Sequence, residues 1–110
     1  MEYNYSVIIP YHDKYELFVK AIGSVPDRKD IQIIIVDNAS IPLNEESIPE
    51  KQNAIVSYTM SSSSKGAGHA RNVGLKMVQG KNIIFLDADD YFTNIAFDAF
   101  DKYKDEEYDV

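Results

Sequence analysis

Three short apolar runs, each followed at once by polar residues, constrain the fold of this chain most strongly. They cover residues 6–10, 31–37 and 82–87 of the 110, and a weaker run covers residues 54–58. Their apolar residues follow one another with little alternation, which is typical of strands covered on both faces, as in parallel sheets. We therefore predict a mostly parallel sheet that lies between two layers of helices.

Amphipathic helical periods separate these runs. We expect Asp13 and Glu16 to begin the first helix as a capping box, and Gly80 to end the second as a left-handed C-cap. The apolar stripes of the three expected helices comprise Leu17, Phe18, Ala21, Ile22 and Val25, then Ala70, Val73, Gly74, Met77 and Val78, then Ile95, Ala99, Phe100 and Tyr103. The alternation of strands and helices predicts one α/β domain over residues 1–110, a three-layer α/β/α fold of Rossmann-like type.

The charge and the amino-acid composition exclude several classes of function. Eighteen acidic residues against eleven basic ones give a formal net charge of −7, and a field of this sign repels nucleic acid. The absence of cysteine removes disulfides, thiolate nucleophiles and cysteine-based zinc sites. No signal peptide is recognisable, and no apolar run approaches the ~20 residues that span a bilayer. We therefore expect a cytoplasmic protein with no nucleic-acid partner and no transmembrane segment.

Acidic residues follow the last apolar run, where a ligand site is expected. In open parallel sheets, ligands bind beyond the carboxyl ends of the strands. If residues 87–89 stay extended, the two-residue period of a strand points the carboxylates of Asp87 and Asp89 to one side. Such a pair could hold Mn²⁺ or Mg²⁺ and leave coordination positions open for a diphosphate. A solvated acidic turn is the alternative interpretation.

Three other residues are candidates for contacts with a nucleotide. Asp37 closes the second run and could accept a hydrogen bond from a base or a ribose, and the alternative is an Asx-turn that leaves the strand. Arg71 follows a glycine-bearing loop at a helix start and could hold a phosphate or a base carbonyl, and the alternative is a surface ion pair. Tyr11 could stack on a base or simply pack. His12 and His69 have no nucleophile partner in the sequence, so a hydrolase triad is not supported.

Four segments in this order resemble the N-terminal half of family 2 glycosyltransferases of the GT-A fold. They are residues 7–12, 35–40, 66–75 and 85–90, and together they cover essentially the whole chain. The chain differs from the family at His12, where the family usually has Asn. It also has Asn38 and Ala39 where the family often shows a second Asp and a Gly.

The resemblance implies a nucleotide-diphospho-sugar donor, UDP- or GDP-linked, and a glycan or lipid-linked acceptor. It places Pro10 and Asp37 in the nucleobase pocket, Arg71 near the base or diphosphate, and Asp87 near the ribose or metal. Asp89 would coordinate Mn²⁺ or Mg²⁺. In the family's inverting reaction, a carboxylate base activates the acceptor hydroxyl, and the resemblance puts that base beyond residue 110. The resemblance fits polysaccharide biosynthesis, and it leaves open a homodimer and peripheral membrane association of the full-length protein.

Two other functions compete with the glycosyltransferase. A phosphatase resembling the haloacid dehalogenase superfamily also carries Asp-X-Asp after an apolar strand, but here Tyr91 and Phe92 follow where a small hydroxyl residue is expected. The other competitor is a non-catalytic nucleotide-binding or interaction module. Because residues 108–110 look like the start of another strand, we also expect this chain to be a fragment that has little transferase activity alone.

Overall fold

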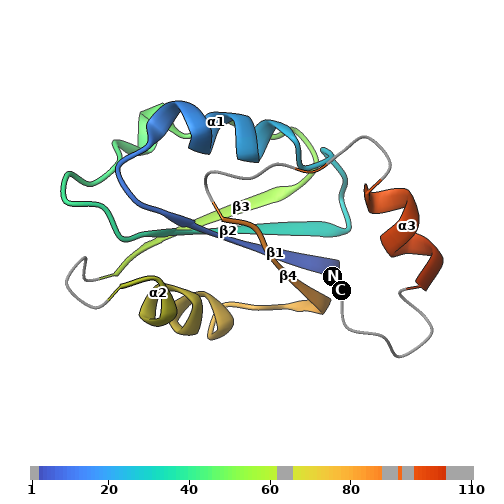
Figure 1. Ribbon diagram of the computed structural model, residues 1–110. Helices are drawn as coiled ribbons and strands as arrows, with labels where there is room; N and C mark the ends of the chain where they lie inside the picture. The colour runs from blue at the N-terminus through green and yellow to red at the C-terminus, as the bar shows by residue number, and fades with distance from the viewer. Residues whose placement is uncertain (1–2, 62–65, 88–91, 93–95, 104–110) are drawn as a thin grey trace.

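The fold is a parallel sheet with helices on both faces. The computed structural model describes residues 3–61, 66–87, 92 and 96–103. The strands are β1 (Tyr3–Tyr11), β2 (Ile31–Asp37), β3 (Ile55–Met60) and β4 (Gly80–Phe85). The helices are α1 (Tyr15–Gly23), α2 (Gly66–Leu75) and α3 (Ala96–Tyr103), with a 3-10 turn at Glu45–Ser47. The strand order is β3-β2-β1-β4 and every pairing is parallel (Figure 1), which confirms the predicted sheet.

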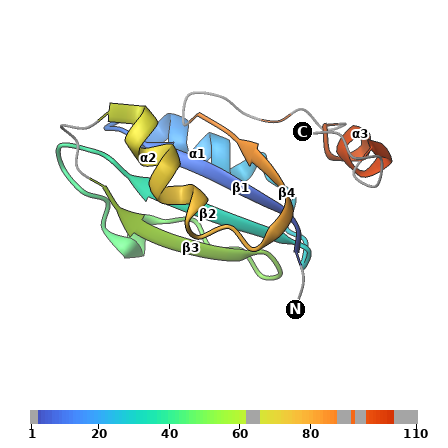
Figure 2. The ribbon, with the colours of Figure 1, turned by 90° about the horizontal axis from the view of Figure 1, so that it is seen from below.

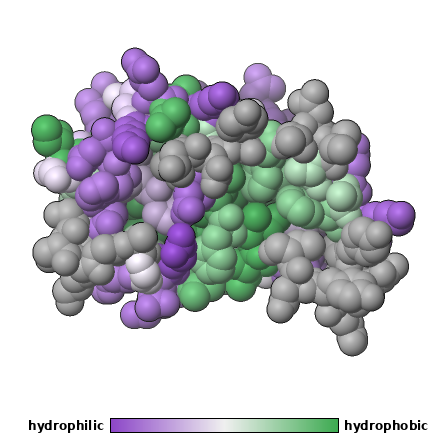
Figure 3. All heavy atoms as spheres, in the orientation of Figure 1, coloured by the Kyte–Doolittle hydropathy of each residue, from purple (hydrophilic) through white to green (hydrophobic). Residues whose placement is uncertain are grey.

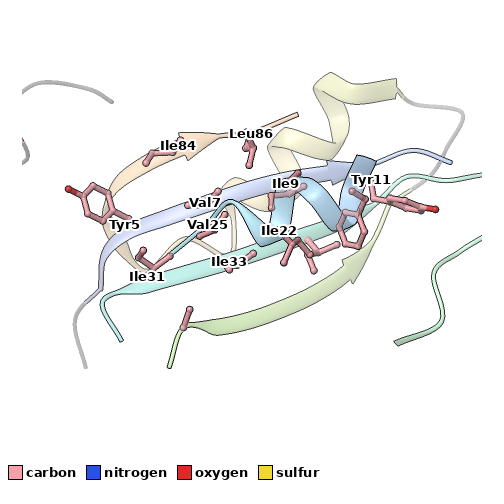
Figure 4. Close-up of a cluster of buried hydrophobic side chains, with 14 of the residues drawn as sticks. Tyr5, Val7, Ile9, Tyr11, Ile22, Val25, Ile31, Ile33, Ile84 and Leu86 are labelled. Carbon is pink, nitrogen blue, oxygen red and sulfur yellow. The ribbon is translucent and has the colours of Figure 1, made fainter. Parts of the chain in front are cut away.

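Helices α1 and α2 cover opposite faces of the sheet, as Figures 1 and 2 show, and this confirms the predicted three layers. Successive residues of a strand point to opposite faces, so each strand feeds both layers. Val7 and Ile9 of β1 join the cluster that packs under α1 (Figure 4), whereas Ile8 joins the cluster that includes Ala70 of α2. Burial on both faces explains why the apolar runs do not alternate.

A charged network lies at the amino end of β2 and reaches α3. Arg28 donates to Asp30 at 2.7 and 2.9 Å and to Asp101 of α3 at 2.9 and 3.1 Å. The Tyr5 hydroxyl donates to Asp101 at 2.8 Å, and the Tyr5 ring meets Phe97 edge to face at 5.2 Å. These contacts join β1, the segment before β2 and α3, which lie far apart in the sequence.

This network predicts a loss of stability in acid. The hydrogen bonds from Arg28 hold the pKa of Asp30 below its ordinary value of 3.8. Because the pKa is lower in the folded state, the stabilisation is complete above about pH 4 and is lost as the pH falls through the folded pKa. We expect the free energy of unfolding, measured by urea denaturation, to fall as the pH is lowered below about 4. Arg28→Met should flatten this part of the profile, while Lys29→Met, which replaces an exposed neighbouring cation, should leave it unchanged.

Both predicted caps are wrong, and each residue serves a non-local contact instead. Asp13 has a positive φ of 60°, and its carboxylate accepts from the Ser40 N–H at 3.0 Å and the Ser40 hydroxyl at 3.2 Å. Lys14 therefore stands at the start of α1, without a side-chain cap. Helix α2 ends at Leu75, and Gly80 is the first residue of β4. Its backbone N–H donates to Ser6 Oγ at 2.8 Å.

The predicted apolar stripes of the first two helices pack on the sheet except for Leu17, but Val25, Met77 and Val78 follow the ends of α1 and α2 instead of belonging to them. Leu17 is exposed, although the rest of its stripe is buried.

The stripe of α3 is shifted. Among the described side chains of α3, Phe97 is buried and packs against Phe92 and Phe100, whereas Ala99 is exposed. Ile95 and the side chain of Tyr103, which the prediction also placed on this stripe, lie outside the described part of the chain. An aromatic ring buries more apolar area than a methyl group, so Phe97 decides which side of this short helix faces the sheet.

The described surface carries apolar side chains at both edges of the sheet. Hydrophobic residues gather in the middle of the face shown in Figure 3, over the sheet between the α1 and α2 layers. The largest exposed apolar side chains of the edge strands are Ile55 and Met60 on β3 and Phe85 on β4. No helix in the described part of the chain is both long enough and apolar enough to cross a membrane.

Candidate functional site

The candidate site lies where the parallel strands end. The order β3-β2-β1-β4 places β2 and β3 on one side of β1 and β4 on the other, so the direction of strand addition reverses at β1. Ligands of such sheets bind beyond the carboxyl ends of the strands at this reversal point. Helix α2 begins at Gly66 on the same edge (Figure 1), and Arg71 lies in its second turn.

Arg71 and Asp87 meet at this edge. An Arg71 guanidinium N–H donates to Asp87 Oδ1 at 2.9 Å, which joins α2 to the residue that follows β4. The side chains are 39% and 51% exposed, so the pair is the surface ion pair that we considered as the alternative for Arg71. An exposed pair of this kind contributes little to stability, about 0–1 kcal/mol. Both charges therefore remain accessible to a ligand at low energetic cost.

The predicted site residues divide between the two faces of the sheet. Pro10 follows the alternation of Ile8 and shares the face of α2 with the Arg71–Asp87 pair. Tyr11 belongs to the cluster under α1, and Asp37 is bonded on that side to Tyr58. The structure therefore brings Arg71 and Asp87 together and places Pro10 on the same face of the sheet, whereas Tyr11 and Asp37 lie on the opposite face.

Asp37 is buried and bound to the protein's own donors. Its exposed fraction is 2%, and its carboxylate accepts from the N–H of Ala39 at 3.0 Å, the N–H of Leu43 at 2.6 Å and the Tyr58 hydroxyl at 2.6 Å. The bond from Ala39, two residues on, is the Asx-turn that we gave as the alternative. Burial and then the bond to Asp37 raise the pKa of Tyr58 above its usual range. Asp37 thus fixes the segment after β2 against β3.

Tyr11 packs in the core beneath α1. Its ring meets Phe18 of α1 edge to face at 4.9 Å, and burial is the main cause that raises the pKa of its hydroxyl. It also borders a hollow of about 590 Å³ beside the 3-10 turn. The polar groups around that hollow are bonded to each other, since Asp13 accepts from Ser40 and Tyr15 donates to the Ser47 carbonyl at 2.6 Å. Tyr11 therefore packs in the core, which is the alternative that we gave to its stacking on a base.

The residues expected to hold a metal are described only in part. Asp89 lies outside the described residues, and within them no group of three or more His, Cys, Asp or Glu side chains is gathered as a metal site would need. Asp87 fits the role of one ligand, because it is an exposed carboxylate and Arg71 contacts only one of its two oxygens in the bond that joins them. Exposed carboxylate oxygens are the donors that Mn²⁺ and Mg²⁺ prefer.

Asn38 is a residue at this edge that our sequence predictions did not include. It is 4% exposed, and its Oδ1 has no hydrogen-bond partner in the described structure; the same holds for the buried Oγ of Ser61. A buried polar atom that is left unpaired typically costs about 1–3 kcal/mol. The departure from the second Asp that the family often shows was the one sign in the sequence that pointed to this position.

Known proteins of similar sequence and structure are glycosyltransferases. Residues 6–110 match the profile of the family described as glycosyl transferase family 2. An uncharacterized glycosyltransferase of Rickettsia conorii is 36% identical over 90 residues, which cover 79% of this chain and 15% of that protein. The Escherichia coli glucosyltransferase WfaP is 31% identical over 87 residues, covering 78% of this chain and 35% of WfaP. A crystal structure of Staphylococcus aureus TarS superposes with a TM-score of 0.72 and 26% identity, covering 96% of this chain and 33% of that one.

This chain therefore belongs to glycosyl transferase family 2. It spans 15% and 35% of the lengths of the two sequence relatives, so these proteins extend well beyond the matched region. Membership of the family favours the transferase over the phosphatase that resembles the haloacid dehalogenase superfamily.

Proposed function

We propose that this chain binds the donor of a glycosyltransferase, a nucleotide-diphospho-sugar, at the carboxyl edge of its sheet. The observation that carries the proposal is the exposed Arg71–Asp87 pair at the point where the strand order reverses. In a chain with a net charge of −7, a diphosphate needs a local cation, and Arg71 supplies one at this edge.

The names of the relatives support the donor class and the acceptor class. WfaP is described as transferring glucose from UDP-Glc to a sugar linked to diphosphoundecaprenol. TarS is described as a poly(ribitol-phosphate) beta-N-acetylglucosaminyltransferase. We accordingly propose a UDP-linked donor in preference to a GDP-linked one, a glycan or lipid-linked acceptor, and a place in polysaccharide biosynthesis.

In the proposed mechanism, Arg71 and the acids after β4 share the charge of the donor. Arg71 contacts the diphosphate with the guanidinium N–H groups that Asp87 leaves free, while Asp87 and Asp89 would hold Mn²⁺ or Mg²⁺. When bound, the metal stabilises the negative charge that develops on the departing nucleoside diphosphate. The acceptor hydroxyl attacks the anomeric carbon from the opposite side, which inverts its configuration, and the base that deprotonates it belongs to a part of the enzyme outside this chain.

Metal-dependent nucleotide binding tests the proposal. We expect UDP with Mn²⁺, at ~100 times its dissociation constant, to stabilise this chain by ~2.7 kcal/mol, because a ligand that binds only the folded state adds RT ln(1 + [L]/Kd). The measurement is a thermal-shift titration with UDP and GDP, with and without Mn²⁺. Asp89→Ala should abolish the part of the shift that depends on the metal.

Asp98→Asn is the matched control, because it removes one exposed carboxylate from α3 without touching the strand ends. It should behave like the unchanged chain. If no nucleoside diphosphate stabilises the folded chain in the presence of metal, the proposed function is wrong.

A further inference from the structure

The segment that carries the acids after β4, residues 87–91, has an anchor at each end. Before it, the Leu86 N–H donates to the Ile8 carbonyl of β1 at 2.9 Å, and Leu86 is 5% exposed in the cluster under α1. After it, the Phe92 N–H donates to Ser24 Oγ at 2.9 Å. The sheet and the end of α1 therefore fix the two points between which the acids lie in the sequence.

Ser24 follows the last residue of α1, and its hydroxyl has a defined direction. The Oγ–H donates to the Ala21 carbonyl at 2.6 Å, so the proton is used at the helix end and the oxygen is left to accept from Phe92. The Ser24 N–H donates to the Lys20 and Ala21 carbonyls at 3.1 and 3.2 Å, which fixes the backbone as well. A serine that only ended the helix would need the bond to Ala21 alone. The second bond joins residues 68 positions apart and serves the segment after β4.

Phe92 is also held by its ring. The ring meets Phe97 and Phe100 of α3 edge to face at 5.1 and 6.0 Å and packs against the cluster under α1. These apolar contacts are not directional, whereas the hydrogen bond to Ser24 specifies one position of the backbone. Ser24 thus fixes the backbone at the end of the segment that carries the acids.

Ser24 and the candidate site lie at opposite edges of the sheet. Helix α1 starts after the carboxyl end of β1 and runs back towards the start of β2, so Ser24 lies at the amino edge (Figure 1). Its hydroxyl is therefore out of reach of a ligand at the Arg71–Asp87 pair. An effect of Ser24 on the acids passes through the backbone of Phe92, which Asp89 precedes by three residues.

The acids need such anchors because like charges repel. Asp87, Asp89 and Asp90 lie in one short stretch of sequence, and carboxylates that are brought together to hold a metal ion destabilise each other until it binds. If the end of the segment were free, the metal would have to order the backbone as it binds, and this lowers its affinity. Hydrogen bonds that orient metal ligands from outside typically raise metal affinity about 10- to 100-fold.

We propose that Ser24 is a positioning residue that raises the affinity of the acids after β4 for a divalent metal ion. Its hydroxyl holds the Phe92 N–H, and this bond limits the positions open to Asp87 and Asp89. The inference rests on the proposed function, because the metal is the ion that accompanies the donor's diphosphate.

UDP binding with and without metal provides the test. We expect Ser24→Ala to bind UDP at least about 10-fold more weakly than the unchanged chain in Mn²⁺, and within about twofold of it in EDTA. The measurement is calorimetric titration at a temperature where both chains are folded. A serine that only ended α1 would lower the stability in urea and leave both dissociation constants unchanged, because these constants refer to the folded chain.

Two variants control for the loss of a hydroxyl group. Ser24→Thr keeps the acceptor and should bind UDP with Mn²⁺ within about threefold of the unchanged chain. Tyr15→Phe removes the hydroxyl that donates to the Ser47 carbonyl at 2.6 Å, at the first residue of the same helix. It should leave UDP binding unchanged in Mn²⁺ and in EDTA.

Amide exchange in the unchanged chain tests the inference even if Ser24→Ala does not fold. If the Ser24–Phe92 bond favours metal binding, the metal must favour this bond to the same extent. Adding Mg²⁺ to the UDP complex should therefore slow exchange of the Phe92 N–H at least about threefold more than exchange of the Ala54 N–H. The Ala54 N–H donates to Asp27 at 2.9 Å, away from the acids.

The outcomes separate this inference from the proposed function. If UDP with Mn²⁺ does not bind the unchanged chain, both are wrong. If UDP binding depends on the metal but Ser24→Ala leaves it unchanged, only the role of Ser24 is wrong. The same conclusion follows if Ser24→Ala weakens UDP binding equally in Mn²⁺ and in EDTA, if its effect persists in Ser24→Thr, or if Mg²⁺ slows exchange equally at Phe92 and Ala54.

Discussion

Replacing Gly80 by alanine is expected to destabilise the chain by about 3 kcal/mol or more, a large part of the 5–15 kcal/mol that stabilises a typical domain. A Cβ atom at Gly80 would lie 2.6 Å from the backbone N of Ser6, the Oγ of Ser6 and the carbonyl carbon of Tyr5. Two of these three atoms belong to the backbone of β1. They cannot withdraw without disturbing the pairing of β1 with β2, which is the centre of the sheet.

The same substitution would also break a polar chain. Ser6 Oγ accepts from the Gly80 N–H at 2.8 Å and donates to Gln32 Oε1 at 2.7 Å, and that oxygen accepts from the Gln79 N–H at 2.9 Å. Moving Ser6 away from a new methyl group would weaken these buried bonds together. Urea denaturation of Gly80→Ala, compared with the unchanged chain, measures the combined loss.

Gly23→Ala is the control for this substitution. Nothing lies within 4 Å of a Cβ built at Gly23, which is the last residue of α1. Alanine there should leave the free energy of unfolding unchanged or raise it by a few tenths of a kcal/mol. Equal stabilities for the two variants would show that β1 yields easily to β4, contrary to the close contact at Gly80.

The strands were predictable because their chemistry is local. An isoleucine run such as residues 33–35 has no polar face to turn to water, and the structure buries all three of these side chains between α1 and α2. The weaker prediction at residues 54–58 became β3 at Ile55–Met60. Its side chains are half-buried or exposed because it is an edge strand, and this explains why its sequence pattern is less distinct.

The caps were not predictable because their partners are distant in the sequence. An aspartate ahead of a helix is equally suited to cap that helix or to accept from another loop, and Asp13 accepts from Ser40, 27 residues away. A glycine after a helix is equally suited to end it or to permit a close approach. Gly80 permits the approach to β1, and only the strand order reveals this.

The candidate site was predictable as a place but not residue by residue. Pro10 and Tyr11 are consecutive in β1, so they cannot both face one ligand from the same side of the sheet, and Asp37 and Asn38 are related in the same way. The sequence fixes this opposition but not which face carries α2 and the Arg71–Asp87 pair. The structure shows that α2 and the ion pair share one face of the sheet, and that the side-chain oxygen without a partner at the end of β2 belongs to Asn38 and not to Asp37.

Asp37→Ala is expected to destabilise the chain by about 3 kcal/mol. A loss of this size without ligand would show that Asp37 has a structural role, as opposed to a role only in contact with the base. The substitution would leave three donors without their acceptor, the N–H groups of Ala39 and Leu43 and the Tyr58 hydroxyl, and it would free the segment after β2. Tyr58→Phe removes only one of these bonds and should cost about 1 kcal/mol, so it calibrates the larger loss. Urea denaturation gives both values.

The resemblance to the family predicts a different result for Asp37→Ala. A residue that serves only the nucleobase would leave the stability of the ligand-free chain unchanged while it weakened UDP binding. In this structure the Asp37 carboxylate is 2% exposed and bonded to three internal donors, so its removal lowers the stability of the ligand-free chain directly. We therefore expect the loss of stability without ligand to be the main effect, and unchanged stability in urea would contradict the structural role of Asp37.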